Sequence, residues 1–266
     1  EISDALVKDF VVTTDPSVVG GADVVVVCVP TPLDGNLGPN LHAVEEAART
    51  IAHHLKPGLL VVLESTTYPG TTEELLIPLL EGSGLIAGQG AVEFYSRLVD
   101  EVVVSGGVKE AEMTKILENT YRHINIALVN EMAQFCAELE IDLWDAIRCA
   151  STKPFGFSPF FPGPGVGGHC IPIDPNYLSH RVQTRLGYAF RFVELAQEIN
   201  DAMPAYVVSR IQRLLNDQAR ALRNSRVLLL GVTYKADVAD TRESPAKDIA
   251  TLLIDLGAHV SFFDPL

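Results

Sequence analysis

The sequence has little positive charge and no long hydrophobic run, and both absences exclude classes of protein. Of its 266 residues, 20 are Lys or Arg and 34 are Asp or Glu, giving a formal net charge of −14. Nucleic acids and anionic membranes need a basic surface, so we expect neither as a partner. The longest apolar run, ADVVVVCVP, is too short to span a bilayer, and the opening EISDALVKDF does not resemble a signal peptide. We therefore expect a cytoplasmic protein.

Cysteine is also scarce, which limits the chemistry open to the chain. The four cysteines form no CxxC pair, and their spacing suits neither a zinc site nor a set of disulfides. We expect no bound metal and reduced thiols throughout. Cys28, Cys136 and Cys149 fall within an expected strand and expected helices, so we interpret them as core residues.

The first part of the chain alternates between β-branched runs and helical patterns. Such alternation is typical of a doubly wound parallel sheet, in which function sits at the carboxyl ends of the strands. Those ends are PTP (30–32) and STTYPG (65–70). The sequence predicts strands at 10–14, 22–29 and 58–65, and helices at 41–55 and 70–81.

The middle of the chain is predicted to be all-α. Residues 108–140 contain neither Pro nor Gly, and 142–151 and 190–217 are also helical, with Pro204 marking a break or kink. The long helix either forms the spine of a dimer or lies buried within its own domain.

The α/β pattern returns at residue 226, with a strand, a helix capped by Ser244 with Pro245 at its first position, and a strand at 259–265. A lone βαβ unit cannot bury both faces of its sheet. The chain also lacks the GxGxxG turn that normally opens a nucleotide-binding α/β domain. We therefore expect both sheets to be incomplete and the working protein to be longer than this sequence.

The stretch PGPGVGGHCIPIDP (162–175) is the strongest candidate for chemistry. If Pro172 starts a helix, Cys170 lies at or just before its N-cap, where the helix dipole favours the nucleophilic thiolate. The glycines would let backbone approach a ligand. The alternative is a buried cysteine beside a glycine-rich turn. Asp174 could act as a base or only offset the dipole, and we interpret His169 as structural.

Two other groups of residues have both a functional and a plain interpretation. Lys115 and Asn119 share one face of the long helix, where they could stabilise an alkoxide or simply meet solvent. Lys235 and Arg242 lie in a polar loop before a helix N-terminus, where they could bind phosphate or form surface ion pairs.

Five stretches together resemble the UDP-glucose/GDP-mannose dehydrogenase family of nucleotide-sugar 6-dehydrogenases. They occur in the family's order and cover most of the chain: VCVPTPLD, ESTTYPGTT, AEMTKILENTYRHINIALVNEMA, FPGPGVGGHCIPIDPNYL and GVTYKADVADTRESPA. The form GGHCIPIDP is more similar to the branch that acts on UDP-N-acetylhexosamines than to the UDP-glucose branch, where Ser is usual in place of His169.

The resemblance implies two Rossmann-like domains flanking an all-α domain. The expected bounds are 1–106 for NAD binding, 107–222 for the central helical dimerisation and catalytic domain, and 223–266 for UDP-sugar binding. It further implies oxidation of the sugar C6 alcohol to a carboxylate with two NAD+, through a thiohemiacetal and a thioester. The partners implied are a UDP-sugar and a second copy, in a homodimer or higher oligomer, and the usual product feeds polysaccharide biosynthesis.

The same resemblance assigns a role to each motif residue. Cys170 is the nucleophile, Lys115 stabilises oxyanions, Asn119 binds substrate or intermediate, and Asp174 and Thr66 position water. The cofactor-binding set implied is Val29, Pro30, Thr31, Ser65, Thr66 and Arg242. The substrate-binding set implied is Lys115, Asn119, Gly167, Gly168, Tyr234 and Lys235.

The sequence departs from the family where 85–94 (LIAGQGAVEF) replaces a longer segment with an active-site Glu, around the junction of Ala87 and Gly90. Alternatives therefore stay open. They are a UDP-glucose 6-dehydrogenase, a β-hydroxyacid dehydrogenase, a non-catalytic UDP-sugar-binding protein, and a thiol hydrolase using Cys170 and His169.

Overall fold

The structure is a computed structural model that describes residues 11–35, 38–80 and 89–265. It divides into two compact units. One holds residues up to Thr31 together with Asn40–Met113, and the other holds Pro32–Pro39 together with Thr114–Leu266. The three domain boundaries expected from the sequence stay a prediction.

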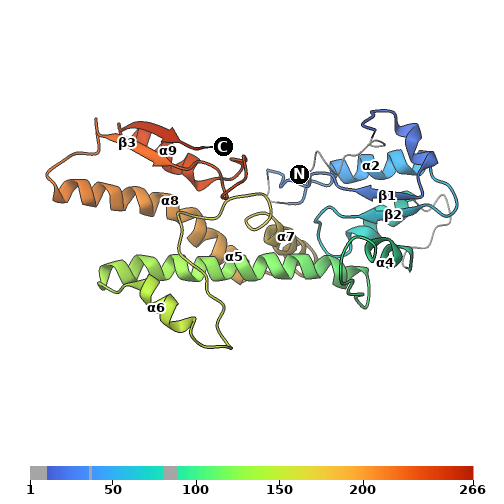
Figure 1. Ribbon diagram of the computed structural model, residues 1–266, viewed down its shortest axis with the longest axis horizontal. Helices are drawn as coiled ribbons and strands as arrows, with labels where there is room; N and C mark the ends of the chain where they lie inside the picture. Colours follow the sequence, from blue (N-terminus) through green and yellow to red (C-terminus); the bar gives the residue numbers. More distant parts are fainter. Residues whose placement is uncertain (1–10, 36–37, 81–88, 266) are drawn as a thin grey trace. The chain divides into compact units, whose positions relative to one another are not determined.

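The first unit is built on two parallel strands, β1 (Val24–Val27) and β2 (Leu60–Leu63), with Val24 opposite Leu60. Helix α2 (His42–His53) lies along this pair (Figure 1), and Val27, Ile51 and Leu59 form their common core. The parallel pair confirms the predicted α/β pattern, because parallel neighbours need a helical crossover. The 3-10 helix η1 (Pro16–Gly21) precedes β1, and α4 (Gln89–Tyr95) follows β2.

The strand predicted at 10–14 is wrong for its described part. Residues 11–14 adopt no regular structure, and Val11 and Val12 are 77% and 85% exposed. No described strand pairs with this segment, so its β-branched side chains have no sheet to pack against. Phe10 lies outside the described residues.

The helix predicted at 70–81 forms in two pieces. A π-helical turn, η2 (Thr72–Leu76), leads into α3 (Ile77–Leu80). Pro78 has no N–H to bond the Glu74 carbonyl, and the Ile77 N–H bonds the Thr72 carbonyl five residues back, which widens the turn. Glu81 lies outside the described residues.

The second unit is largely helical, as predicted. Its elements are the 31-residue helix α5 (Val108–Glu138), which starts in the first unit, α6 (Leu143–Ala150), α7 (Asp174–Leu186), α8 (Arg191–Asp217) and α9 (Pro245–Asp255), with the parallel strands β3 (Arg226–Leu230) and β4 (His259–Phe263). Val208 of α8 and Leu253 of α9 share a core with β3 and β4, as Figure 1 shows for the elements.

Two proline predictions had different outcomes. Pro204 does not break α8, which runs from Arg191 to Asp217 with Pro204 buried inside it. Pro245 lies at the first position of α9 as predicted, although the Ser244 side chain makes no capping bond.

The expectation that three cysteines are core residues holds only for Cys136. That residue packs with Val129, Leu143 and Ile147 between α5 and α6, whereas Cys28 and Cys149 are exposed. Cys28 follows the last residue of β1, and Cys149 lies on the outer face of α6. Apolar neighbours in sequence therefore did not predict burial at these two positions.

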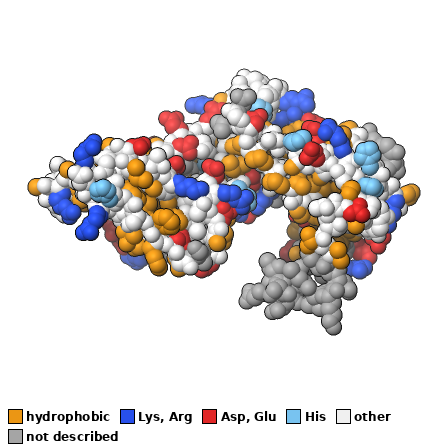
Figure 2. All heavy atoms as spheres, turned by 90° about the horizontal axis from the view of Figure 1, so that it is seen from above, with side chains coloured by type: hydrophobic (Ala, Val, Ile, Leu, Met, Phe, Trp, Pro, Cys, Tyr) orange, Lys and Arg blue, Asp and Glu red, His pale blue; other side chains and the backbone are white. Residues whose placement is uncertain are grey.

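Hydrophobic side chains also reach the surface, as the orange spheres of Figure 2 show. Within the second unit, four large ones lie along α5 at spacings of four and seven residues: Leu117, Tyr121, Leu128 and Phe135. No described helix is both long and apolar enough to cross a membrane.

Candidate active site

A buried hydrogen bond joins the two helices that carry the predicted catalytic residues. Asn119 of α5 donates from Nδ2 to Oδ2 of Asp174 at 2.6 Å, and both residues are buried. Asp174 is the first residue of α7, where a carboxylate interacts favourably with the helix N-terminus. Two residues 55 positions apart in sequence are thus held together, as the motif assignment requires.

Cys170 lies in the turn that leads into α7, but the helix starts later than predicted. Pro172 is not its first residue. The N–H groups of Ile173 and Asp174 both bond the Cys170 carbonyl, and α7 begins at Asp174 with Pro175 next. Asn176 holds this turn by donating from Nδ2 to the Pro172 carbonyl at 2.8 Å. The tight turn keeps Cys170 close to Asp174.

The pKa of the Cys170 thiol is raised, contrary to the expectation that a helix dipole would lower it. The main cause is burial, and the neighbouring Asp174 carboxylate adds to it. Lys115, Arg122 and Arg242 oppose the rise through their positive charges. Burial and the Asp174 carboxylate therefore outweigh the three cations.

The pKa of Asp174 is also shifted from its ordinary value. Burial raises its pKa to about 6, while the bond from Asn119 and the charge of Lys115 act in the opposite direction. A carboxyl with a pKa near neutrality can accept and return a proton at working pH, which suits a general base. Lys115 is exposed, and its positive charge acts on both Cys170 and Asp174.

A second buried chain of polar groups holds the glycine-rich loop. Asn130 of α5 accepts a bond from the Gly163 N–H at 2.8 Å and donates to Asn200 of α8 at 2.9 Å. Asn200 in turn lies 3.5 Å from Nδ1 of the buried His123, whose pKa burial lowers to about 4. A neutral imidazole is therefore part of the scaffold behind the loop. The sequence interpretation missed this chain, although Asn130 and His123 lie seven residues apart on α5.

The glycines before Cys170 have a packing role that the sequence interpretation did not predict. A Cβ on Gly167 would lie 2.8 Å from Tyr234 Cβ, and one on Gly168, whose φ is +86°, would lie 2.8 Å from Tyr234 Cε2. The Gly168 N–H also donates to the Arg242 carbonyl at 3.3 Å. The two glycines thus let the loop pack closely on the Tyr234–Arg242 segment.

Arg242 and His169 lie beside this contact. Arg242 forms a forked ion pair with Asp240, with distances of 2.6 to 3.1 Å, and this pair lowers the Asp240 pKa to about 2. Its charge also acts on Cys170. The His169 ring meets the Tyr234 ring edge to face, at 6.4 Å between centroids. This contact gives His169 a packing role, as the sequence interpretation expected.

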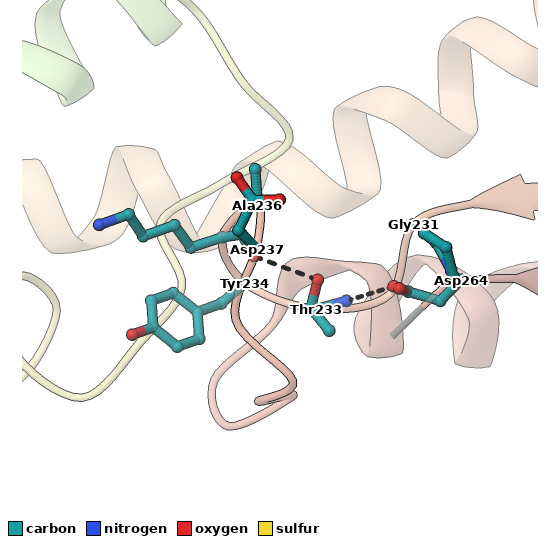
Figure 3. Close-up of a pocket in the computed structure, with 8 residues that line it drawn as sticks. Gly231, Thr233, Tyr234, Ala236, Asp237 and Asp264 are labelled. Atoms are coloured by element: carbon teal, nitrogen blue, oxygen red, sulfur yellow. Dashed lines mark hydrogen bonds between the residues drawn. The ribbon is translucent and has the colours of Figure 1, made fainter. Parts of the chain in front are cut away.

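Lys235 lines a pocket at the carboxyl ends of β3 and β4. The pocket has a volume of about 380 Å³ and is lined by Gly231, Thr233, Tyr234, Lys235, Ala236, Asp237, Asp264 and Pro265. Asp264 shapes it by accepting bonds from the Val232 and Thr233 N–H groups at 2.7 and 3.1 Å. Figure 3 shows the Tyr234 ring pointing away from Asp264. Open α/β sheets bind ligands at this edge, so the pocket is the natural place for a nucleotide.

The corresponding edge of β1 and β2 is tied together by hydroxyl groups. Ser65 Oγ accepts from the Val29 N–H at 2.9 Å and donates to the Val29 carbonyl at 2.8 Å, and Thr31 Oγ1 donates to the Thr66 carbonyl at 2.8 Å. These bonds join the two loops that follow the strands. Pro30 and the Thr66 side chain are part of the same edge. The Ser65 hydroxyl is already bonded to backbone. We therefore expect this edge to form the floor of a cofactor site and not to bond the cofactor through Ser65.

Arg122 is a site residue that the sequence interpretation missed. It lies three residues after Asn119 and seven after Lys115, so helical spacing alone places all three on one side of α5.

Among the described residues, no group of three or more His, Cys, Asp or Glu side chains is arranged to hold a metal. The family has an active-site Glu to which no residue of this sequence was assigned. Its place would be near the junction of Ala87 and Gly90, and residues 81–88 lie outside the described ranges.

Sequence comparison assigns all three parts of the chain to one family. Residues 2–125 match the NAD binding domain of the UDP-glucose/GDP-mannose dehydrogenase family, residues 109–202 its central domain and residues 228–266 its UDP binding domain. The chain belongs to the UDP-glucose/GDP-mannose dehydrogenase family, which confirms the resemblance of its five motifs.

Several relatives are more specific. The chain is 37% identical to UDP-N-acetyl-D-mannosamine dehydrogenase of Methanococcus maripaludis, over 92% of this chain and 63% of the relative. It is 36% identical to UDP-N-acetyl-D-glucosamine 6-dehydrogenase of Pseudomonas aeruginosa, over 91% and 66%. The solved UDP-D-ManNAc dehydrogenase of Pyrococcus horikoshii superposes with a TM-score of 0.85 at 30% identity, covering 95% of this chain and 68% of that one. The chain thus spans 63% to 66% of the length of these two curated relatives.

Proposed function

We propose that the protein is an NAD-dependent dehydrogenase that oxidises the C6 alcohol of a UDP-N-acetylhexosamine to the carboxylate. The observation that carries this proposal is the Asn119–Asp174 bond beside Cys170, which assembles a thiol, a carboxyl of near-neutral pKa and a lysine. Family membership and the similarity to UDP-N-acetylhexosamine dehydrogenases support the reaction and the substrate class.

The residues of the second unit supply the covalent chemistry. Loss of a hydride and a proton from the C6 alcohol first gives the aldehyde. The Cys170 thiol then adds to this aldehyde, forming a C–S bond while its proton passes to the new hydroxyl oxygen, and the product is a thiohemiacetal. Loss of a hydride and a proton leaves a thioester. Water, deprotonated by Asp174, then cleaves the C–S bond, so that the carboxylate leaves and the thiol returns.

Lys115 and Asn119 act on the oxygen at C6. The Lys115 ammonium group stabilises the negative charge that develops on this oxygen, first as an alkoxide and later in the tetrahedral intermediate. The Asn119 amide holds Asp174 in place and, with Lys115, lowers the pKa of Asp174 against the effect of burial. Cys170, having a raised pKa, is mostly a thiol at neutral pH, so it needs a base as it attacks.

NAD+, when bound, accepts the two hydrides that the oxidation releases. Val29, Pro30, Thr31, Ser65 and Thr66 are proposed to form the floor of its site, with Arg242 contacting its pyrophosphate and Thr66 also assisting the attacking water. Lys235, Tyr234 and the backbone of Gly167 and Gly168 are proposed for the UDP-sugar, with the β3–β4 pocket receiving the nucleotide.

We also propose that the protein forms a dimer through α5. The exposed side chains of Leu117, Tyr121, Leu128 and Phe135 repeat at near-heptad spacing, which suits packing against a second copy. Replacing Leu128 and Phe135 by Glu should convert the dimer to a monomer in light-scattering measurements. An unchanged mass would contradict this interface.

The decisive test measures NADH and product from each UDP-sugar with the full-length protein. We expect two NADH per uronic acid formed from a UDP-N-acetylhexosamine and slower turnover of UDP-glucose. One NADH per substrate would point to a simple alcohol dehydrogenase of the β-hydroxyacid type. Tight UDP-sugar binding without NADH would indicate a non-catalytic protein, and substrate cleavage without NADH would indicate a hydrolase.

A further inference from the structure

Arg122 contacts the site from the outer side of Asn119, and the proposed mechanism gives it no role. Its Nη1 donates to Asn119 Oδ1 at 3.3 Å, and its Nη2 pairs with the Glu118 carboxylate one turn earlier on α5. Arg122 is partly buried, whereas Asn119 is fully buried. A cation is therefore held against one end of a buried amide.

The two ends of that amide are chemically different, so its orientation matters. Asn119 presents its NH₂ group to Asp174 at 2.6 Å and its oxygen to Arg122. If the amide were reversed, its oxygen would face the Asp174 carboxylate and its NH₂ group would face a guanidinium, and both contacts would be repulsive. Arg122 thus favours the one orientation that stabilises ionised Asp174.

The same guanidinium carries a charge that acts on the thiol. Arg122 is one of three cations that work against the raised pKa of Cys170. The other charged groups around the thiol are Lys115 from α5, Asp174 from α7 and Arg242 from the loop before α9, and Asp240 and His169 lie beside Arg242. Of the three cations, only Arg122 has a hydrogen bond to Asn119 in the described structure.

We propose that Arg122 is a positioning residue of the active site, which sets the ionisation of both Cys170 and Asp174 by fixing the Asn119 amide and by holding a positive charge beside the thiol. Its effect on turnover rests on the proposed function, but its effect on the two ionisations does not. Loss of Arg122 should make the thiol harder to ionise and the carboxyl easier to protonate.

The test is the pH dependence of Cys170 alkylation by iodoacetamide, followed peptide by peptide with mass spectrometry between about pH 6 and pH 10. We expect Arg122→Gln to move the Cys170 midpoint upward by about half to one pH unit. Arg122→Lys should restore most of that midpoint, because it keeps the charge. The exposed thiols of Cys28 and Cys149 report on the reagent in the same sample.

A matched control exists on α6. Arg148 lies 3.6 Å from the Cys149 sulfur and pairs with Asp145, so Arg148→Gln should leave the alkylation of Cys170 unchanged. Thermal melting of each variant shows whether the fold is intact. An unchanged Cys170 midpoint in folded Arg122→Gln would overturn the proposal.

Activity separates this proposal from the proposed function. If the protein oxidises UDP-sugars, Arg122→Lys should keep the alkylation midpoint but lower kcat with little change in KM, because lysine cannot hold the Asn119 amide as the guanidinium does. A kcat equal to that of the parent would contradict the proposal that Arg122 fixes the Asn119 amide. If no UDP-sugar is oxidised at all, the alkylation shift still decides whether Arg122 tunes the thiol.

Discussion

The edge of the β1–β2 sheet and the surroundings of Cys170 both carry motif residues, but they are built differently. At the sheet edge, the hydroxyl groups of Ser65 and Thr31 bond neutral backbone groups. Around Cys170, the Asn119 amide of α5 bonds a buried carboxyl on α7, and the charge of Lys115 acts on the same carboxyl. The bonds at the sheet edge hold the conformation of two loops. Those around Cys170 also determine which side chains are ionised. Substitutions should therefore affect stability at the edge and chemistry at the thiol.

The largest effect should come from Cys170→Ala. Removing the sulfur removes the covalent adduct, so uronic acid formation should fall at least about 10³-fold while UDP-sugar and NAD+ binding persist. Cys170→Ser should trap a slowly hydrolysed ester, because an alkoxide is a poorer leaving group than a thiolate. Mass spectrometry of enzyme and product measures both. Cys149→Ala is the control, and acid formation by Cys170→Ala at the parent rate would refute covalent catalysis.

Lys115→Ala should have the next largest effect. An ammonium group aimed at developing negative charge contributes more to turnover than to binding, so kcat should fall by about 10² to 10³ and UDP-sugar affinity should change less. Lys109→Ala on the same helix is the control, because Lys109 is paired with Glu73 at 2.6 Å. Weaker binding at full turnover would reduce Lys115 to a binding residue.

Asp174→Asn should separate stability from activity. Burial raises the Asp174 pKa to about 6, so the folded chain binds this proton more tightly than the unfolded chain. The contribution of Asp174 to stability is therefore present at low pH and lost as pH rises through 6. Asp174→Asn should be inactive, yet up to about 3 kcal/mol more stable than the parent near neutral pH.

The stability gain should disappear in acid, where Asp174 is protonated in both states of the parent. Urea unfolding at several pH values gives the difference between the two proteins, which cancels the other titrating groups. Asp145→Asn is the control, because the Asp145 side chain on α6 is exposed. A variant less stable than the parent at neutral pH would mean that the ionised carboxylate stabilises the site.

The smallest effect should be at the sheet edge. Ser65→Ala leaves the partly buried Val29 N–H without its acceptor, which should cost about 1 kcal/mol of unfolding free energy. Ser96→Ala, which removes only a bond to the preceding turn of its own helix, should cost less. If Ser65→Ala abolished turnover without lowering stability, the edge would be a chemical site and the contrast between the two regions would fail.

Much of this architecture was predictable from local pattern. Helices α5, α6 and α8 lie where 3.6-residue periodicity placed them, and β1 and β2 lie within the predicted strands. The motif spacing also put Lys115 and Asn119 on one face of α5. These features depend on residues close together in sequence, whose geometry a helix or strand fixes by itself.

The predictions that were wrong depended on distant contacts. Val11 and Val12 have strong β propensity but no described partner strand, so they stay exposed. The packing of Tyr234 against Gly168 was not predicted, because nothing near Gly168 in sequence reveals it. The Cys170 pKa was expected to be lowered, because a dipole can be inferred from sequence whereas burial and the approach of Asp174 cannot.

The sequence by itself determined the family, the order of the elements and which residue types carry the proposed chemistry, because those are properties of motifs read along the chain. Only the tertiary structure decided the ionisation of Cys170 and Asp174 and the part played by Arg122. Desolvation and charge interactions depend on distances between side chains, and α5 and α7 reach those distances only when the helices pack together.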